Sequence, residues 1–137
     1  MKSVVKKFSL LAFVMIGFAI SLLAQDGKKI IAVINRADWC HVCQANGEKM
    51  MNEVMPVFKG SAVQFMMNDL TNENTKEDSK KMLTDKNVYA AVKKTTSTGV
   101  LLLVDLKTGK LLEKISVAES AEKLIEVIRK RSIVEKM

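Results

Sequence analysis

The sequence predicts a small α/β domain in which helices cover both faces of a mixed four-stranded sheet. Short β-branched or aliphatic runs alternate with longer stretches of helical periodicity, and the last two runs are joined by a short turn. The resulting element order is β-α-β-α-β-β-α. A βαβ unit pairs its strands in parallel through a right-handed crossover, whereas the final hairpin is antiparallel, so the sheet is expected to be mixed.

The N-terminal segment has the pattern of a secretory signal peptide. Three lysines precede the apolar run 8–24, which ends in the small residue Ala24. Cleavage after Ala24 would leave one domain of residues 25–137. Retention as an N-terminal membrane anchor is the alternative, because the run of 17 residues is just under the ~18 expected of a spanning helix. In both cases residues 25–137 are expected outside the cytoplasm, either periplasmic or secreted.

Length and charge limit the classes of function. Of the 22 Lys and Arg in the chain, three lie in residues 1–24 together with no acid, so the remaining residues carry a formal charge of +4 (19 basic against 15 acidic). These residues suffice for a single small core. Their lysines are interspersed with acids rather than gathered in a stripe with aromatics, so no nucleic-acid partner is expected.

The first half of the domain contains a strand, a helix and a second strand. The segment 28–35 is nearly all apolar and rich in β-branched residues, which is typical of a strand buried on both faces. A helix is predicted from Cys40 onward, with Gly47 as a weak point and Pro56 kinking or ending it. The segment 62–70 is the second predicted strand.

The second half supplies the remaining helices and a hairpin. Polar residues 71–81 lead into a predicted helix over 82–94, with a break near the sequence TDKN. Strands are predicted over 99–106 and 110–116, and the short link between them favours an antiparallel hairpin. A helix over 120–131 closes the domain.

The stretch ADWCHVCQ contains the chain's only two cysteines, its only tryptophan and its only histidine. Cys40 and Cys43 are three residues apart at a helix start, so their sulfurs lie one turn apart and close enough to join. Unpaired backbone N–H groups and the helix dipole favour a thiolate at the first position. A thiolate attacks disulfides, and a second cysteine deeper in the helix can resolve the mixed disulfide. The pattern therefore predicts a redox dithiol.

Two other roles for these cysteines remain open. One is a structural disulfide. Because it closes a loop of only four residues, it would lower the entropy of the unfolded chain little and stabilise the fold by only about 2 kcal/mol. As metal ligands, Cys40, His41 and Cys43 fall short of the four that structural zinc requires, so a metal would need a site shared between two chains. Covalent haem requires CxxCH, whereas Gln44 follows Cys43.

Residues 28–131 contain, in order, the strand IIAVIN, the motif ADWCHVC, a helix, and the later GVLLLVDLKTGKLL with a final helix. In these segments the chain resembles the thioredoxin superfamily. The resemblance implies a minimal thioredoxin-like three-layer sandwich and a protein thiol–disulfide oxidoreductase without a cofactor. It implies that Cys40 attacks and Cys43 resolves, and that Trp39 shapes the docking surface rather than the core. Its partners would be proteins with thiols or disulfides and a membrane or periplasmic redox partner that resets the dithiol.

The sequence departs from the family pattern near the dithiol. Thr98 and Gly99 stand where the family has its cis-proline loop, and glycine permits unusual dihedrals without enforcing a cis bond. Ile34 stands where many members hold a buried acid that accepts the proton of the resolving thiol, so water is expected to accept it instead.

The residues between and around the cysteines also differ. His41, if cationic, would stabilise a Cys40 thiolate and make the disulfide more oxidising, whereas a solvent-facing His41 would have little influence. Relatives without the proline can bind metal at the cysteines. The alternative function is therefore a non-enzymatic metal- or cluster-binding module that uses Cys40, Cys43 and His41.

Overall fold

The structure is a computed structural model of the 137-residue chain, and it describes residues 29–133. The predicted signal peptide or anchor, residues 1–24, lies outside the described residues. Within residues 29–133, none of the helices has the length and apolar character needed to cross a bilayer.

The sheet has four strands in the order β2-β1-β3-β4. The central strand β1 (Ile30–Arg36) pairs in parallel with the edge strand β2 (Val63–Asp69). The other central strand, β3 (Val100–Asp105), is antiparallel to β1 and to β4 (Leu111–Ser116). The predicted mixed sheet and element order are confirmed. Each predicted strand end differs from the observed one by at most two residues.

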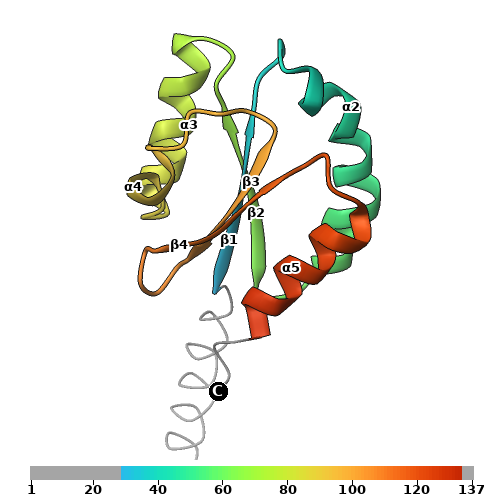
Figure 1. The fold of residues 1–137 in the computed structure, drawn as a ribbon. Coiled ribbons are helices and arrows are strands. Elements are labelled where there is room, and N and C mark those ends of the chain that lie inside the picture. The colour runs from blue at the N-terminus through green and yellow to red at the C-terminus, as the bar shows by residue number, and fades with distance from the viewer. Residues whose placement is uncertain (1–28, 134–137) are drawn as a thin grey trace, which may run out of the picture.

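Helices cover both faces of the sheet (Figure 1). One face carries α2 (His41–Lys49) and α5 (Ala121–Ile133), and the other carries α3 (Glu73–Asp85) and the short α4 (Tyr89–Val92). The chain thus forms the predicted three layers. The motif ADWCHVCQ lies where β1 passes into α2, at one end of the sheet.

The core consists of two apolar clusters, one on each face of the sheet. Successive residues of β1 point to opposite faces, which explains why this strand is apolar at almost every position. The cluster toward α5 includes Ile30, Ala32, Ile34, Met50, Val54, Leu101, Leu103, Leu124 and Ile128. The cluster toward α3 and α4 includes Ile31, Val33, Met66, Leu83, Val88, Val92, Leu102 and Val104.

The helix after the cysteines changes its geometry before Pro56. The α-helix α2 ends at Lys49, a π-helical turn η1 follows over Met50–Val54, and a 3-10 turn η2 covers Met55–Phe58. Proline has no N–H to donate and its ring clashes with the preceding turn, which disfavours continued α-helix there. The predicted kink at Pro56 is thus observed, whereas Gly47 lies inside α2 without interrupting it.

The prediction of a helix over 82–94 is wrong at its N-terminal end. The helix α3 begins at Glu73, because Asn72 Oδ1 accepts the Thr75 N–H (3.0 Å) and Thr75 Oγ1 accepts the Asn72 N–H (3.1 Å). The polarity of residues 73–81 reflects a helix that buries only a narrow stripe. The predicted break at TDKN is observed, with Asn87 at a φ of 60° between α3 and α4.

Candidate functional site

Cys40 and Cys43 form a disulfide at the N-terminus of α2. Cys40 is the N-cap residue in extended conformation, and its Sγ accepts the Cys43 N–H at 3.2 Å. Its side chain is buried, with 6% of the residue exposed, whereas Cys43 is half-buried. The predicted juxtaposition of the two sulfurs at a helix start is therefore present. A reduced Cys40 in this position would have a backbone donor aimed at its sulfur, which favours the thiolate.

Gly99 lies directly against the motif that contains the disulfide. It has a φ of 74°, and a β-carbon built at this position would lie 2.9 Å from Cγ1 of Val42 and 3.7 Å from Sγ of Cys40. Only glycine adopts such a φ without cost, so this close approach depends on the missing side chain. No cis peptide bond occurs in the described part of the chain, so the segment before β3 reaches the cysteines through trans bonds.

Asn35 joins this segment to the cysteines and to the sheet. Its backbone carbonyl accepts the Gly99 N–H at 2.8 Å and lies 3.9 Å from Sγ of Cys43. Its side chain is fully buried, and Nδ2 donates to the carbonyls of Thr95 (2.9 Å) and Ser97 (3.2 Å). Its Oδ1 accepts from Nδ2 of Asn68 at 2.9 Å.

Asn35 is a residue of the site that the sequence analysis does not identify. The available signal was a polar residue at the end of a strand predicted to be buried on both faces. Such a residue must find hydrogen-bond partners inside the protein. Which partners it finds depends on the loop before β3, some 60 residues later in the chain.

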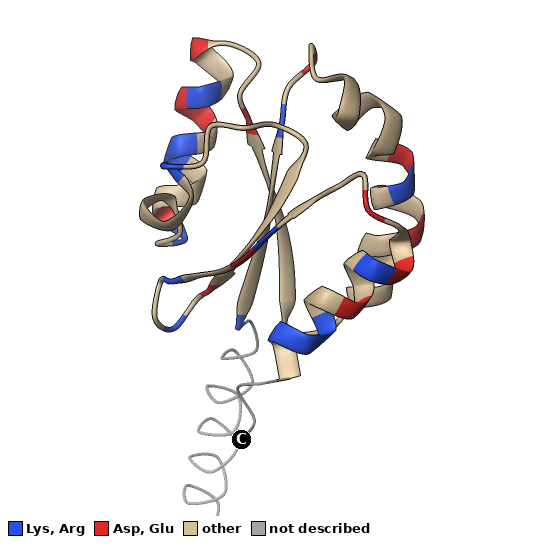
Figure 2. Cartoon of the chain, in the orientation of Figure 1, with Lys and Arg blue, Asp and Glu red and all other residues tan. Residues whose placement is uncertain are grey.

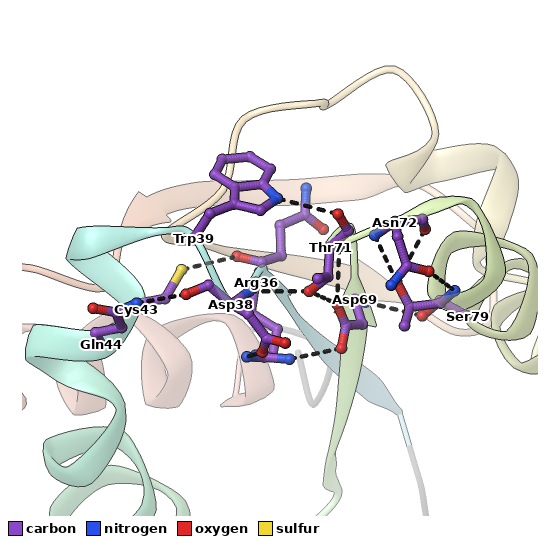
Figure 3. Close-up of polar contacts among 11 residues, drawn as sticks. Arg36, Asp38, Trp39, Cys43, Gln44, Asp69, Thr71, Asn72 and Ser79 are labelled. Carbon is purple, nitrogen blue, oxygen red and sulfur yellow. Dashed lines mark hydrogen bonds and ion pairs between the residues drawn. The ribbon is translucent and has the colours of Figure 1, made fainter.

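Trp39 lies beside the disulfide with 60% of its surface exposed. Its indole Nε1–H donates to the backbone carbonyl of Thr71 at 3.2 Å, which anchors one edge of the ring to the segment before α3 (Figure 3). The alternative in which Trp39 fills the core is therefore wrong. An exposed, anchored indole next to the disulfide is suited to contact with another molecule.

A polar network next to Trp39 holds the ends of β1 and β2 together (Figure 3). Arg36 donates to Asp69 Oδ2 at 2.6 Å and to Asp38 Oδ1 at 2.5 Å. Burial alone would raise the pKa of Asp69, but hydrogen bonds from Thr71 and the charge of Arg36 outweigh it, so the pKa of Asp69 lies below its ordinary value. The hydrogen bond to Asp38 is the main reason that the pKa of Arg36 is raised.

The remaining predicted site residues surround the disulfide at different depths. His41 is exposed as the first residue of α2, and Thr98 is half-buried next to Gly99. Ile34 is buried in the core cluster on the α5 side of the sheet. A small cavity of about 60 Å³ adjoins Cys43 and is lined by Ile34, among others.

The described residues offer little to a metal. Between residues 29 and 133 there is no group of three or more His, Cys, Asp or Glu side chains placed to hold a metal ion. Both cysteines are bonded to each other.

Comparisons with known proteins find similarity to this chain only at the level of the fold. No protein-family model matches it, and no curated protein matches it. Among solved structures it is similar to a DsbH oxidoreductase, at 19% identity and a TM-score of 0.52 over 80% of this chain and 76% of that one. It is also similar to thioredoxin f2 of Chlamydomonas reinhardtii (16% identity, TM-score 0.50, 78% and 82% covered).

A third similar structure is the thioredoxin domain of a thiol-disulfide oxidoreductase from Bacteroides vulgatus (15% identity, TM-score 0.50, 80% and 84% covered). At these identities the likeness concerns the fold. It agrees with the observed mixed sheet and the helical layers on both of its faces. The described chain therefore has the thioredoxin fold that the sequence predicted.

Proposed function

We propose that the protein exchanges thiols and disulfides with other proteins through Cys40 and Cys43. The observation that carries this proposal is the disulfide at the N-terminus of α2, with the Cys43 N–H directed at Sγ of Cys40. The thiolate is the reactive form of cysteine, and this arrangement stabilises it at Cys40. Trp39 and the segment of Thr98 and Gly99 flank the disulfide and offer a surface on which a substrate can dock.

In the reducing direction, the Cys40 thiolate attacks one sulfur of a substrate disulfide. The substrate S–S bond breaks, a Cys40–substrate disulfide forms, and the departing substrate thiolate takes up a proton. Cys43 then loses its proton and attacks Sγ of Cys40, which releases the second substrate thiol. Two electrons pass from the dithiol to the substrate, the two substrate thiolates take up protons from water, and the Cys40–Cys43 disulfide remains.

The proton of Cys43 requires an acceptor that is not a buried acid, since Ile34 occupies that position. The cavity of about 60 Å³ next to Cys43 is large enough for a water molecule, and Asn46 and Arg36 line it. Water in this cavity would accept the proton when Cys43 becomes the nucleophile. His41, exposed beside Cys40, would add to thiolate stability only when it is cationic.

Repeated turnover requires a partner that resets the dithiol. A reductase would receive two electrons from a membrane or periplasmic dithiol, and an oxidase would pass them to an oxidant. We place residues 25–137 outside the cytoplasm, periplasmic or secreted, on the basis of the basic and apolar pattern of residues 1–24. Attachment to the membrane would require that residues 8–24 be retained.

The proposal is tested with the reduced protein and a protein disulfide such as that of insulin. Wild type should reduce it, Cys40→Ser should be inactive, and Cys43→Ser should accumulate a Cys40–substrate disulfide that is visible as a shifted band without reductant. Absence of that trapped species, together with a stoichiometric metal in gently purified protein, would contradict the proposal and favour the metal-binding alternative. The reduction potential of the Cys40–Cys43 couple, measured against glutathione, assigns the direction.

A further inference from the structure

A pocket of about 320 Å³ is lined by Trp39, by Lys76 of α3 and by Tyr89 and Val92 of α4. It is bounded by the segment after β2, by α3 and α4, and by the segment that leads to β3. Its lining includes Trp39, Asn68, Lys76, Tyr89, Lys93, Thr95 and Thr96.

The pocket adjoins the disulfide site through Trp39. Trp39 lines the pocket and immediately precedes Cys40 in the chain. Thr95 and Thr96, on the opposite wall, belong to the segment that Asn35 fixes and that ends at Gly99 against the cysteines. A polypeptide with its sulfur at Cys40 therefore has this pocket within reach of its neighbouring residues.

The pocket has a buried polar group in its lining. Asn68 is 7% exposed, and its Nδ2 donates to Oδ1 of Asn35 at 2.9 Å. No hydrogen bond to Oδ1 of Asn68 is present among the described residues, so this oxygen is available to an N–H donor. A buried amide that retains an acceptor is suited to a peptide group in the pocket.

The rim of the pocket is cationic. Lys76 and Lys93 line it, and none of its lining residues is Asp or Glu. The ammonium of Lys76 pairs with the exposed carboxylate of Glu73 at 2.9 Å, whereas Lys93 has no ion pair within the described part of the chain. Lys80 lies over the ring of Tyr89, 5.7 Å from its centroid. Figure 2 shows that acidic and basic residues alternate along α3.

We infer that this pocket binds an acidic side chain in the segment of a protein substrate that flanks its reactive cysteine. The inference rests on the proposed function and names its substrate class. The two lysines attract the carboxylate, the faces of Trp39 and Tyr89 pack against its aliphatic stem, and Asn68 receives a backbone N–H. Exposed charge pairs are weak, so the preference amounts to a factor of about three to five in kcat/KM.

The test uses three matched peptide disulfides that carry Glu, Gln or Lys two residues from the cysteine. Wild type should favour the Glu peptide over the Gln peptide about three- to five-fold and disfavour the Lys peptide. Lys93→Glu should reverse this order. Lys107→Glu, an equal change of charge in the turn after β3 and outside the pocket, should keep the wild-type order. Equal kcat/KM for the three peptides in wild type would overturn the inference.

Two further measurements separate this result from failure of the proposed function. Bis(2-hydroxyethyl) disulfide is small and neutral, so its reduction reports the dithiol alone. Wild type should reduce it if the proposed function holds, and Lys107→Glu should reduce it at the wild-type rate. Peptides in which serine replaces the cysteine report binding alone, through the fluorescence of Trp39, the chain's single tryptophan. Binding of the Glu peptide that Lys93→Glu weakens several-fold and Lys107→Glu leaves at the wild-type level would support the pocket even without turnover. No fluorescence change with any peptide would overturn it.

Discussion

The backbone of Gly99 lies so close to Val42 that no side chain fits between them, since a β-carbon at position 99 would lie 2.9 Å from Cγ1 of Val42. We predict that Gly99→Ala lowers the free energy of unfolding by about 2–4 kcal/mol, because it combines a positive φ with overpacking. Val42 or the segment before β3 must then move, so disulfide exchange should slow as well. Urea unfolding and the insulin assay measure the two effects.

Gly109 provides the matched control for this substitution. It also has a positive φ, 68°, but a β-carbon there would meet nothing within 4 Å. Gly109→Ala should therefore cost about 1 kcal/mol, the conformational part alone, and leave exchange unchanged. In a Val42→Ala background, Gly99→Ala should recover part of its extra cost. Equal losses for Gly99→Ala and Gly109→Ala would show that the contact with Val42 is unimportant.

Asn35 should be the most sensitive polar position of the described chain. Asn35→Ala leaves the carbonyls of Thr95 and Ser97 and the amide of Asn68 without this partner inside the protein. We expect a loss of about 2–3 kcal/mol in the free energy of unfolding, since unsatisfied buried groups are costly. Urea unfolding measures the loss, and Asn52→Ala, at an exposed position, should change stability by less than about 0.5 kcal/mol. A small effect of Asn35→Ala would mean that water replaces the amide.

Because of Asp69, the free energy of unfolding should fall when the pH is lowered into the acid range. Its pKa is lower in the folded protein than the ordinary value of about 3.9, so its contribution is complete above that value and is lost as the pH falls through the folded pKa. The difference in unfolding free energy between wild type and Asp69→Asn should be about 0.5–1 kcal/mol larger at pH 6 than at pH 2.5. Asp78→Asn, at an exposed position of α3, serves as control. A difference that does not change with pH would rule out the Arg36 and Thr71 contacts as its source.

The sheet and the cysteine site could be predicted from sequence because their signals are local. The apolar run of β1, the hairpin turn and the CxxC motif can each be recognised from a few consecutive residues. The start of α3 was missed because Asn72 and Thr75 form a capping box without the usual Ser or Thr followed by Glu. The contacts of Asn35 and the approach of Gly99 to Val42 depend on distant segments, and spacing along the chain carries no signal for such tertiary contacts.

Substitutions of Trp39 should affect substrate docking much more than folding. Because 60% of it is exposed, Trp39→Ala should change the free energy of unfolding by less than about 1 kcal/mol. The same substitution removes an aromatic contact surface beside Cys40, so kcat/KM toward a protein disulfide should fall about ten-fold. Trp39→Phe keeps a ring but loses the hydrogen bond to Thr71, and an intermediate loss is expected. Reduction of bis(2-hydroxyethyl) disulfide should stay within two-fold of wild type in both variants. An equal loss on both substrates would instead mean that Trp39 acts on the reactivity of Cys40.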